Sequence, residues 1–391
     1  MDVFADRMSR VPRSFIREIL KVSLDPAIIS FAGGLPNKDF FPVSEIQQAT
    51  QTVFASRGAE VLQYSNSEGI LTLRQQIAER YRHRHGFSIA PEEILITNGS
   101  QQGLDLLGKV LLNSGDGVLI EEPGYLGAIQ SLSIFRPHFY PVRVDAAGMD
   151  VTMLDDVSRR AAAKLLYTVP NFQNPAGLTY SDEVRQAMAG IAARDGFLIV
   201  EDDPYGELRF SGKHRRSFYH YLPEQTVLLG TFSKTIAPGF RIGWIVAPEK
   251  VREKLLVAKQ AADLHTSSVC QAIISQYLQD NDLDQHLQAI TAAYGRQCQA
   301  MVDCIGRYLP AEVKLILPEG GMFLWGELPA GYNSMTLFGH AQREKVVFVP
   351  GDPFYTNTVN PSTFRLNFSC STPEVIETGM VRLAKAFAAY T

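Results

Sequence analysis

Short apolar runs alternate with stretches of helical composition between about residues 90 and 247, and this alternation constrains the fold more than any other feature. The runs are apolar throughout, without a polar residue at every second position, which is typical of strands covered on both faces of a sheet. Strands separated by helices in this way predict a largely parallel α/β sheet. Seven strands are predicted, at residues 94–97, 118–121, 139–142, 165–168, 198–201, 227–229 and 242–246.

The helical stretches carry recognisable end signals. Ser181 can cap a helix whose first turn holds Asp182 and Glu183, and Gly196 can end it. After about residue 290 the regular alternation stops, and Thr372 with the proline after it begins a last amphipathic helix. We therefore expect an N-terminal arm over residues 1–42 that joins the small domain, a large domain over 43–290 and a small C-terminal domain over 291–391.

The composition gives no sign of a charged macromolecular partner. Hydrophobic residues make up 46% and charged residues 20% of the chain, with a net charge of −4, so neither nucleic acid nor an anionic membrane is expected. The basic runs at 80–85 and 213–216 are interpreted as solvated faces. No apolar run approaches the ~18 residues of a membrane span. The four cysteines lack metal-ligand spacing and the first residues lack a signal core, so we expect a cytoplasmic protein without a metal.

The segment TFSKTIAPGFRIGWIVAP, residues 231–248, places Lys234 just after an apolar run. A lysine at the end of a buried strand is costly to desolvate as a cation, so its pKa should fall toward that of a free amine. A free amine is what a Schiff base with an aldehyde requires. The hydroxyls of Thr231 and Ser233 and the guanidinium of Arg241 suit the phosphate of pyridoxal phosphate. A strand-end lysine that reaches back to water is the commoner arrangement. Lys234 alone therefore does not indicate a cofactor site, and further residues of the chain are needed to support one.

Two other predicted strands are followed by groups that suit such a cofactor. After residues 94–97, Gly99, Ser100 and Gln101 would form a helix N-terminus, whose free backbone N–H groups and dipole favour a phosphate. The alternative for Ser100 is an ordinary helix cap. After residues 118–121 comes Tyr125, whose ring could lie against a flat ligand or simply pack in the core.

Two further strand ends add an amide, a carboxylate and a phenol. Asn174 precedes a proline, which fixes the amide on a rigid turn, and the bond between them is a candidate cis peptide; an ordinary Asn-Pro turn is the alternative. Asp202 emerges from a buried strand, which is costly unless a cation pairs with it. A protonated pyridine nitrogen would be such a cation; a salt bridge or a helix cap is the alternative. Tyr205 follows three residues later.

These groups are expected to converge, because ligands of open parallel sheets lie beyond the carboxyl ends of the strands. Asp202 would hold the ring nitrogen protonated and so make the ring an electron sink. Asn174 and Tyr205 could hydrogen-bond the 3′ oxygen of the ring and lower the imine pKa. Lys234 would first bind the cofactor and then move a proton between the substrate Cα and C4′.

Eight motifs in order over nearly the whole chain carry a family resemblance: FAGGLPN, QYSNSEGILTLR, TNGSQQGLDLL, EEPGY, PNFQNPAG, EDDPYGEL, TFSKTIAPGFRIGW and FRLNFS. The sequence resembles fold-type I pyridoxal-phosphate aminotransferases of class I/II. More narrowly, it resembles the branch with 2-aminoadipate, kynurenine and aromatic aminotransferases and the aminotransferase-like part of MocR regulators. The resemblance implies an aspartate-aminotransferase-like fold, with a mostly parallel seven-stranded sheet in the large domain and a smaller α+β domain.

The resemblance also implies roles for single residues. Lys234 would bond covalently to the cofactor, Asp202 would pair with its ring nitrogen and Tyr125 would stack on its ring. Arg365 in FRLNFS would grip the substrate α-carboxylate, for which a planar fork is suited; a structural ion pair is the alternative. The other implied cofactor contacts are Asn174 and Tyr205 at the 3′ oxygen, and Ser100, Gln101, Thr231, Ser233 and Arg241 at the phosphate.

Three more residues bear on the substrate and on assembly. By resemblance Gly34 would line the substrate pocket beside Asn174, and Tyr64 would reach across a homodimer to the partner's cofactor phosphate and substrate, which makes the site composite. Arg17 aligns with an arginine that can turn toward the distal carboxylate of acidic substrates, and a solvent-facing arginine is the alternative. The implied reaction moves the amino group of an L-amino acid (2-aminoadipate, aromatic or broad range) to a 2-oxo acid, with 2-oxoglutarate favoured.

Two rival functions use the same residues. A pyridoxal-phosphate lyase or decarboxylase would differ in which bond at the substrate Cα is broken. A non-catalytic sensor domain, as in MocR regulators, would be preceded by a basic DNA-binding module, and we expect none because the arm begins this chain.

Overall fold

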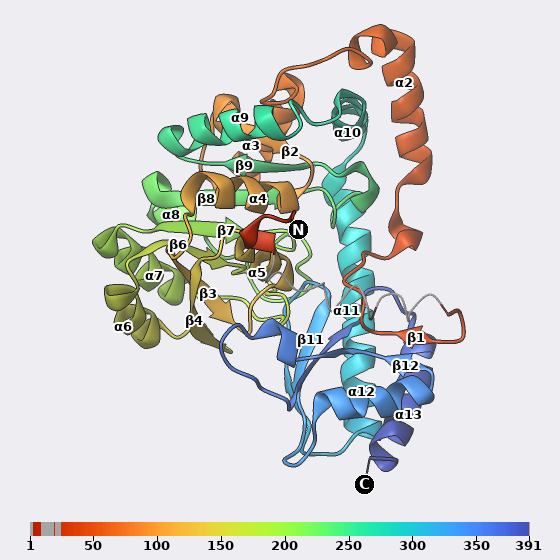
Figure 1. The fold of residues 1–391 in the computed structure, drawn as a ribbon. Coiled ribbons are helices and arrows are strands. Elements are labelled where there is room, and N and C mark those ends of the chain that lie inside the picture. The colour runs from red at the N-terminus through yellow and green to blue at the C-terminus, as the bar shows by residue number, and fades with distance from the viewer. Residues whose placement is uncertain (1–2, 9–18, 20–24, 391) are drawn as a thin grey trace.

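The structure is a computed structural model that describes residues 3–8, 19 and 25–390. Its main feature is an eight-stranded sheet with the order β2-β9-β8-β7-β6-β3-β4-β5 (Figure 1). Strands β8, β7, β6, β3 and β4 run parallel, whereas β9 is antiparallel to β2 and β8, and β5 to β4. The strands are β2 Ile94–Thr97, β3 Gly117–Glu122, β4 His138–Asp145, β5 Gly148–Met149, β6 Ala163–Thr168, β7 Leu198–Asp202, β8 Thr226–Thr231 and β9 Gly243–Val246.

All seven predicted strands are present, and every residue of β2 and β8 is buried, as continuous apolar runs imply. The structure adds β5, which the sequence analysis missed. This strand has two residues and pairs with β4 through Val144–Met149 and Asp145–Gly148. A two-residue strand carries no hydrophobic period, so only the tight turn from β4 could have indicated it.

Helices cover both faces of the sheet. On one face, α4 packs closely on the sheet, since a Cβ at Gly103 would lie 3.0 Å from Leu229. On the other face, the Trp244 indole of β9 donates to the Tyr81 hydroxyl of α3 at 3.0 Å. The helices of this part are α2 Val43–Val61, α3 Leu71–His85, α4 Ser100–Leu111, α5 Leu126–Ser133, α6 Val151–Ala161, α7 Asp182–Asp195, α8 Phe218–Tyr221, α9 Glu249–Ala262 and α10 Ser268–Asp280.

The predicted helix ends are confirmed. The Ser181 hydroxyl accepts a hydrogen bond from the Val184 N–H at 3.2 Å and caps α7, and Gly196 ends that helix in the left-handed conformation with φ 77°. Thr372 caps the last helix in the same way, with 3.5 Å between its hydroxyl and the Val375 nitrogen. Local capping chemistry therefore fixes both helix starts at the predicted residues.

A second, smaller group of elements lies below the large sheet in Figure 1, and α11 runs between the two. Its antiparallel sheet has the order β10-β11-β14-β13, and β12 pairs in parallel with β1 of the N-terminal arm. The arm thus joins the C-terminal elements, although the domain boundaries themselves stay a prediction. The elements are β1 Ile29–Ser30, β10 Lys314–Ile316, β11 Phe323–Glu327, β12 Val346–Val347, β13 Val349–Pro350, β14 Thr363–Asn367, α11 Leu283–Tyr308, α12 Ser334–Arg343 and α13 Pro373–Ala388.

Short single-turn helices connect several of these elements, at Asp6–Met8, Lys38–Phe40, Pro91–Glu93, Pro223–Gln225, Pro238–Phe240 and Asp352–Phe354. Within the described ranges, no helix combines the length and the apolar character needed to cross a bilayer.

Candidate active site

The carboxyl ends of the parallel strands and of β2 lie at one edge of the large sheet, and predicted site residues lie at or after all of these ends except that of β4. Asp202 is the last residue of β7, and Lys234 follows β8 by three residues. Asn174 lies in the loop after β6, Tyr125 comes just before α5, and Ser100 begins α4 directly after β2. Because the strands are neighbours in the sheet, the topology places these residues at the same edge.

Lys234 lies between the sheet edge and the N-terminal arm. Its Nζ donates to the Gly34 carbonyl oxygen at 2.7 Å. Burial lowers the pKa of the amine to about 8, and the nearby positive charges of Arg365 and Arg241 also lower it. An amine with this pKa is a better nucleophile and a better proton acceptor near neutral pH than an exposed lysine.

Asp202 is a buried carboxylate with one free oxygen. It is 2% exposed, and its Oδ2 accepts a hydrogen bond from the Tyr167 hydroxyl at 2.7 Å, whereas Oδ1 has no hydrogen-bond partner in the described structure. Burial is the main reason why the pKa of Asp202 rises to about 7. Neither a salt bridge nor a helix cap uses this carboxylate within the described residues, so both alternatives to a bound cation lack support there.

Arg365, Asn174 and Tyr205 form a chain of side-chain hydrogen bonds. Arg365 donates from Nη1 to the Asn174 Oδ1 at 2.7 Å, and Asn174 Nδ2 lies 3.4 Å from the Tyr205 hydroxyl. The bond between Asn174 and Pro175 is cis, as predicted. The three polar side chains therefore face a common space, although they come from β14 and from the loops after β6 and β7.

Arg365 is also a buried cation without an acidic partner in the described part of the chain. It is 1% exposed, its Nη2 donates to the Ala32 carbonyl oxygen at 2.7 Å, and its Nε has no partner there. The guanidinium lies over the Phe323 ring at 4.2 Å from the centroid. Burial lowers its pKa to about 10. A buried guanidinium that lacks a carboxylate is suited to bind one from a ligand.

The N-terminus of α4 and Arg241 form a candidate phosphate cradle. Gly99 precedes α4 with φ +73° and ψ 166°, a backbone conformation that is open to glycine and nearly closed to other residues. A Cβ at Gly99 would lie 2.5 Å from the Arg241 Nη2, so glycine also leaves room for the guanidinium. Free backbone N–H groups at Ser100 and Gln101, the helix dipole and Arg241 together favour an anion.

Thr231 and Ser233 carry hydroxyls on the short loop that leads to Lys234. The Ser233 N–H donates to the Thr231 Oγ1 at 3.1 Å, and the two hydroxyl oxygens lie 2.9 Å apart. These bonds hold the shape of the loop. A contact of either hydroxyl with a phosphate stays a prediction.

Comparison with known proteins identifies the family. Residues 28–383 match the family "Aminotransferase class I and II". The chain belongs to this family. It is 39% identical to aromatic-amino-acid aminotransferase 1 of Thermococcus litoralis, over 98% of this chain and 93% of that protein. It is 38% identical to 2-aminoadipate transaminase of Thermus thermophilus, over 98% and 96% of the two chains.

The fold comparison agrees. The structure of Pyrococcus horikoshii kynurenine aminotransferase, in complex with PMP and with kynurenine as substrate, superposes with a TM-score of 0.95 at 36% identity, covering 99% of this chain and 97% of that one. The expected fold-type I architecture, the aminotransferase class and its pyridoxal phosphate cofactor are therefore confirmed for this aminotransferase.

The residues present in the aminotransferase fit that cofactor. The buried Oδ1 of Asp202 has no hydrogen-bond partner in the described structure, and buried polar atoms are seldom left so. It can accept a hydrogen bond from the protonated ring nitrogen. The Lys234 amine lies at the same sheet edge, and the space next to Gly99 and Arg241 is suited to the phosphate. The assignment of each contact to a single residue remains our prediction.

Tyr125 and Gln101 both lie against Gly127 at the start of α5, and Gln101 connects α4 to it. The Tyr125 ring lies against Gly127, where a Cβ would be 2.5 Å from the hydroxyl oxygen. Burial raises the pKa of Tyr125 to about 12, and the negative charge of Asp202 also raises it. Gln101 Nε2 donates to the Gly127 carbonyl oxygen at 3.1 Å, so the start of α4 is tied to the start of α5.

The three predictions about the substrate and the assembly have different outcomes in the structure. Gly34 lies at the site, because its carbonyl oxygen accepts from Lys234. Tyr64 is 79% exposed and lies edge-on to His265, with 5.9 Å between ring centroids, and its contact with a partner's site stays a prediction. Arg17 lies outside the described residues.

The sequence analysis missed two residues that hold the aminotransferase site together. One is Tyr167, the partner of Asp202. The other is Glu121, whose buried carboxylate accepts from Thr168 at 2.6 Å and from Gln173 at 2.8 Å, and so fixes both ends of the loop before Asn174. A carboxylate and a phenol inside otherwise apolar strands were the signal that could have found them.

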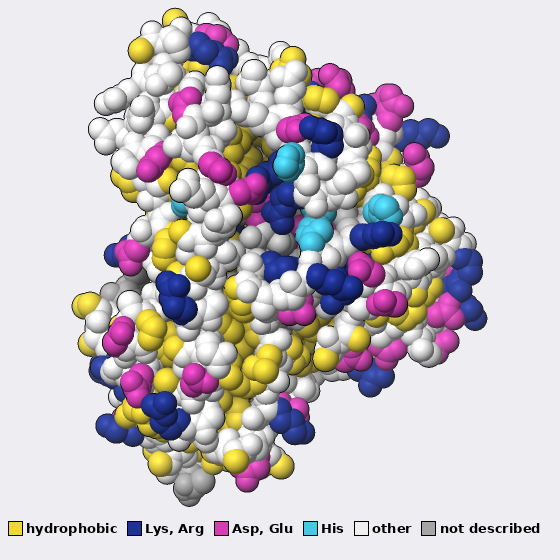
Figure 2. Space-filling model, turned by 180° about the vertical axis from the view of Figure 1, so that it is seen from behind, with side chains coloured by type: hydrophobic (Ala, Val, Ile, Leu, Met, Phe, Trp, Pro, Cys, Tyr) yellow, Lys and Arg dark blue, Asp and Glu magenta, His cyan; other side chains and the backbone are white. Residues whose placement is uncertain are grey.

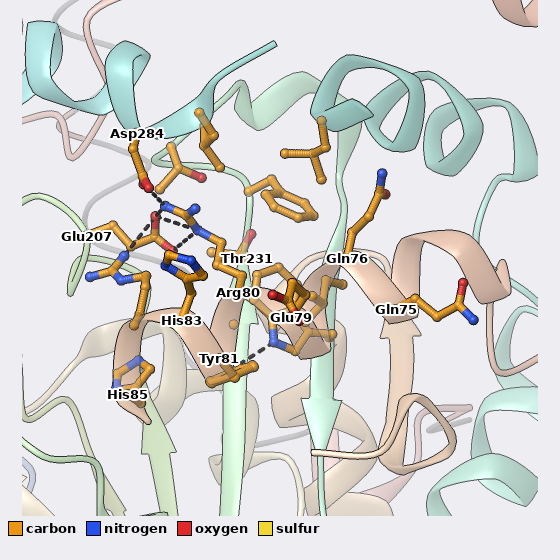
Figure 3. Close-up of a pocket in the computed structure, with 18 of the residues that line it drawn as sticks. Gln75, Gln76, Glu79, Arg80, Tyr81, His83, His85, Glu207, Thr231 and Asp284 are labelled. Carbon is orange, nitrogen blue, oxygen red and sulfur yellow. Dashed lines mark hydrogen bonds and ion pairs between the residues drawn. The ribbon is translucent and has the colours of Figure 1, made fainter. Parts of the chain in front are cut away.

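A separate hollow of about 600 Å3 lies between α3 and the junction of α10 with α11. Figure 2 shows Lys, Arg and His side chains around the hollow on the rear face, and Figure 3 shows that Arg80 is in contact with Glu207 and Asp284. Arg84 also pairs with Glu207 at 2.8 Å. These charges are paired with one another. The hollow reaches the loop around Lys234 at Thr231, Phe232 and Thr235.

Proposed function

We propose that this aminotransferase moves the amino group of an L-amino acid with an acidic or aromatic side chain to a 2-oxo acid, with 2-oxoglutarate as acceptor. One observation carries the proposal. The proposed site combines three groups: the Lys234 amine, whose pKa is lowered, the Asp202 carboxylate oxygen that has no partner, and the Arg365 guanidinium, which has no acidic partner within the described residues. Together they supply a nucleophile, a partner for a ring cation and a partner for a carboxylate.

Pyridoxal phosphate, when bound, supplies an electron sink for the pair of electrons left at the substrate Cα. Asp202 would hold the ring nitrogen, and Asn174 and Tyr205 would hold the 3′ oxygen. Tyr125 would stack on the ring, and the phosphate contacts within the chain would come from Ser100, Gln101, Thr231, Ser233 and Arg241. Most of these groups are held by hydrogen bonds within the chain, so little reorganisation is needed on binding.

Lys234 would take the proton from the substrate Cα and deliver it to C4′ of the cofactor, and the second half-reaction would run this transfer in reverse onto the 2-oxo acid. Its pKa of about 8 suits both directions near neutral pH. The Gly34 carbonyl oxygen, at 2.7 Å from Nζ, would orient the amine. The arm that carries Gly34 would also cover the site and exclude water.

Arg365 would bind the α-carboxylate of the substrate by its planar fork. Asn174 accepts from Nη1 and the Ala32 carbonyl oxygen accepts from Nη2, so the guanidinium is already oriented. The rings of Phe323 and Phe354, at 4.2 and 5.3 Å from the guanidinium carbon, keep it away from bulk water. A charged hydrogen bond in such a site contributes about 1.5–3 kcal/mol.

The substrate class is supported by the relatives named 2-aminoadipate transaminase and aromatic-amino-acid aminotransferase, which match nearly the whole chain. An acidic side chain would need a cation near its far end. We propose that Arg17 supplies this cation for 2-aminoadipate and for 2-oxoglutarate, whereas aromatic side chains would pack against apolar residues of the arm.

We also propose a cytoplasmic homodimer in which Tyr64 completes the site of the partner. Phe54, Leu62 and Tyr64 are 44%, 70% and 79% exposed in the single chain and lie within eleven residues of one another. Such exposed apolar groups are typical of a surface that another protein covers.

A single-turnover experiment tests the function. The protein is loaded with pyridoxal phosphate and mixed with L-2-aminoadipate, an aromatic amino acid or alanine in separate runs. We expect the visible absorbance of the cofactor to fall fastest with the first two, and 2-oxoglutarate to restore it with formation of glutamate. Release of ammonia or carbon dioxide in place of an oxo acid would show a lyase or a decarboxylase.

A further inference from the structure

Within the described residues, Tyr167 is the only side chain that hydrogen-bonds the Asp202 carboxylate. Tyr167 lies in β6, next to the β7 strand that ends at Asp202, and it is fully buried with 0% exposure. Its hydroxyl donates to Asp202 Oδ2 at 2.7 Å. The other oxygen, Oδ1, is buried and has no partner in the described part of the protein. One oxygen is therefore anchored and the other is free.

The surroundings make this anchor important, because they disfavour a carboxylate. Asp202 is influenced by the negative charges of Asp203 and Glu121, and its other titratable neighbours are the phenols of Tyr125, Tyr167 and Tyr205. Burial and the two acids raise the pKa of Asp202, whereas the Tyr167 hydrogen bond lowers it. A protonated Asp202 could not pair with a protonated ring nitrogen.

We propose that Tyr167 is a positioning residue for this aminotransferase, which holds the Asp202 carboxylate by one oxygen and presents the other to the ring nitrogen of the cofactor. The inference rests on the proposed function, since it requires that cofactor in this site. A carboxylate is planar, so a fixed partner on Oδ2 also fixes the direction of Oδ1. Without the hydroxyl, both oxygens would be buried and unanchored, and the charged form would lose its one donor.

The test reads the ring nitrogen directly and does not depend on turnover. The wild type, Tyr167→Phe and Asp202→Asn are each loaded with pyridoxal phosphate that carries an isotope-labelled ring nitrogen, and the nitrogen resonance is followed over pH by NMR. We expect the nitrogen to lose its proton at a pH about one to two units lower in Tyr167→Phe than in the wild type. In Asp202→Asn it should be unprotonated at neutral pH.

Tyr180→Phe is a matched control. Tyr180 is also fully buried, and its hydroxyl donates to the Glu121 carboxylate at 2.7 Å, so it loses the same kind of hydrogen bond at a different carboxylate. Thermal unfolding should report a similar loss of stability for both Tyr→Phe variants, but the nitrogen titration of Tyr180→Phe should match the wild type. The inference also predicts that Tyr167→Phe lowers kcat about 10- to 100-fold with little change in KM, and has no further effect in the Asp202→Asn background.

The outcomes separate the inference from the function. If the wild type binds no pyridoxal phosphate, the proposed function fails and takes the inference with it. If the wild type binds it but Tyr167→Phe titrates like the wild type, or if Tyr180→Phe shifts the titration equally, the function stands and the positioning role of Tyr167 is wrong.

Discussion

The Lys234 amine donates a hydrogen bond to the carbonyl oxygen of Gly34 at 2.7 Å, although the two residues are 200 positions apart. The lysine extends from the edge of the large sheet, whereas Gly34 belongs to the arm that pairs with the C-terminal elements through β1 and β12. The candidate nucleophile is therefore held between the two parts of the protein. Its burial there lowers its pKa, which is the property that the proposed chemistry needs.

Replacement of Lys234 by methionine should stabilise the cofactor-free protein at neutral pH. The pKa of the buried amine is about 8 against an ordinary value of 10.5, so below pH 8 the folded state carries a buried ammonium at a cost of about 3 kcal/mol. Between these values the unfolded chain holds more protons, and the stability of the wild type rises with pH. Denaturant unfolding should show the advantage of Lys234→Met at pH 7 shrinking toward pH 10.5. A constant difference would mean that the amine titrates normally.

Arg365→Lys should weaken amino-acid binding much more than cofactor binding. The lysine keeps the charge but loses the planar fork that binds a carboxylate at two points. We expect the amino-acid Kd to rise about 10- to 100-fold and the pyridoxal phosphate Kd to change by less than about threefold. Arg241→Lys is the matched comparison and should show the reverse pattern. Equal losses of both ligands in Arg365→Lys would contradict its role.

Gly99→Ala should weaken the binding of pyridoxal phosphate. The added Cβ would lie 2.5 Å from the Arg241 Nη2 and displace the guanidinium from the cradle. Gly86→Ala is the control, because Gly86 has the same φ of +73° but a Cβ added there would meet no other atom within 4 Å. Gly86→Ala should lose about 1 kcal/mol of stability through backbone strain, and Gly99→Ala more, because ψ is 166° at Gly99 and 12° at Gly86. Equilibrium dialysis should find weaker binding only for Gly99→Ala; an equal effect in both would assign it to strain alone.

A mixture of Tyr64→Ala and Lys234→Ala chains should regain activity that neither variant has. If Tyr64 acts on the partner's site, a mixed dimer contains one site with both residues intact. Random reassembly makes about half of the dimers mixed, so about a quarter of wild-type activity should return. Refolding the two variants together and assaying the mixture gives the measurement. No recovery would place Tyr64 outside the partner's site.

Local signals in the sequence were sufficient for much of the fold. The strands at the sheet centre are continuous apolar runs, and Ser181 and Gly196 fix the ends of α7 by capping chemistry that involves only nearby residues. The sequence also predicted that Asp202, Tyr205 and Lys234 lie at one edge of the sheet, because parallel strands bring their carboxyl ends to the same edge.

Contacts that depend on strand register could not be predicted from the sequence. Tyr167 meets Asp202 only because β6 and β7 pair with Thr168 opposite Glu201, and neither strand alone specifies that register. Arg365 and Asn174 are 191 residues apart, and their hydrogen bond requires the docking of β14 against the loop after β6. The proposed contact of Tyr64 with a second chain was suggested by the family resemblance alone and stays a prediction.

Chemical trapping of the cofactor on Lys234 tests the central claim most directly. The protein loaded with pyridoxal phosphate is treated with borohydride, which turns a carbon–nitrogen double bond into a stable single bond, and the digested peptides are identified by mass spectrometry. We predict one phosphopyridoxyl adduct, on the peptide that contains Lys234. An adduct on another lysine, or no adduct in a protein that still turns over its substrate, would contradict the account.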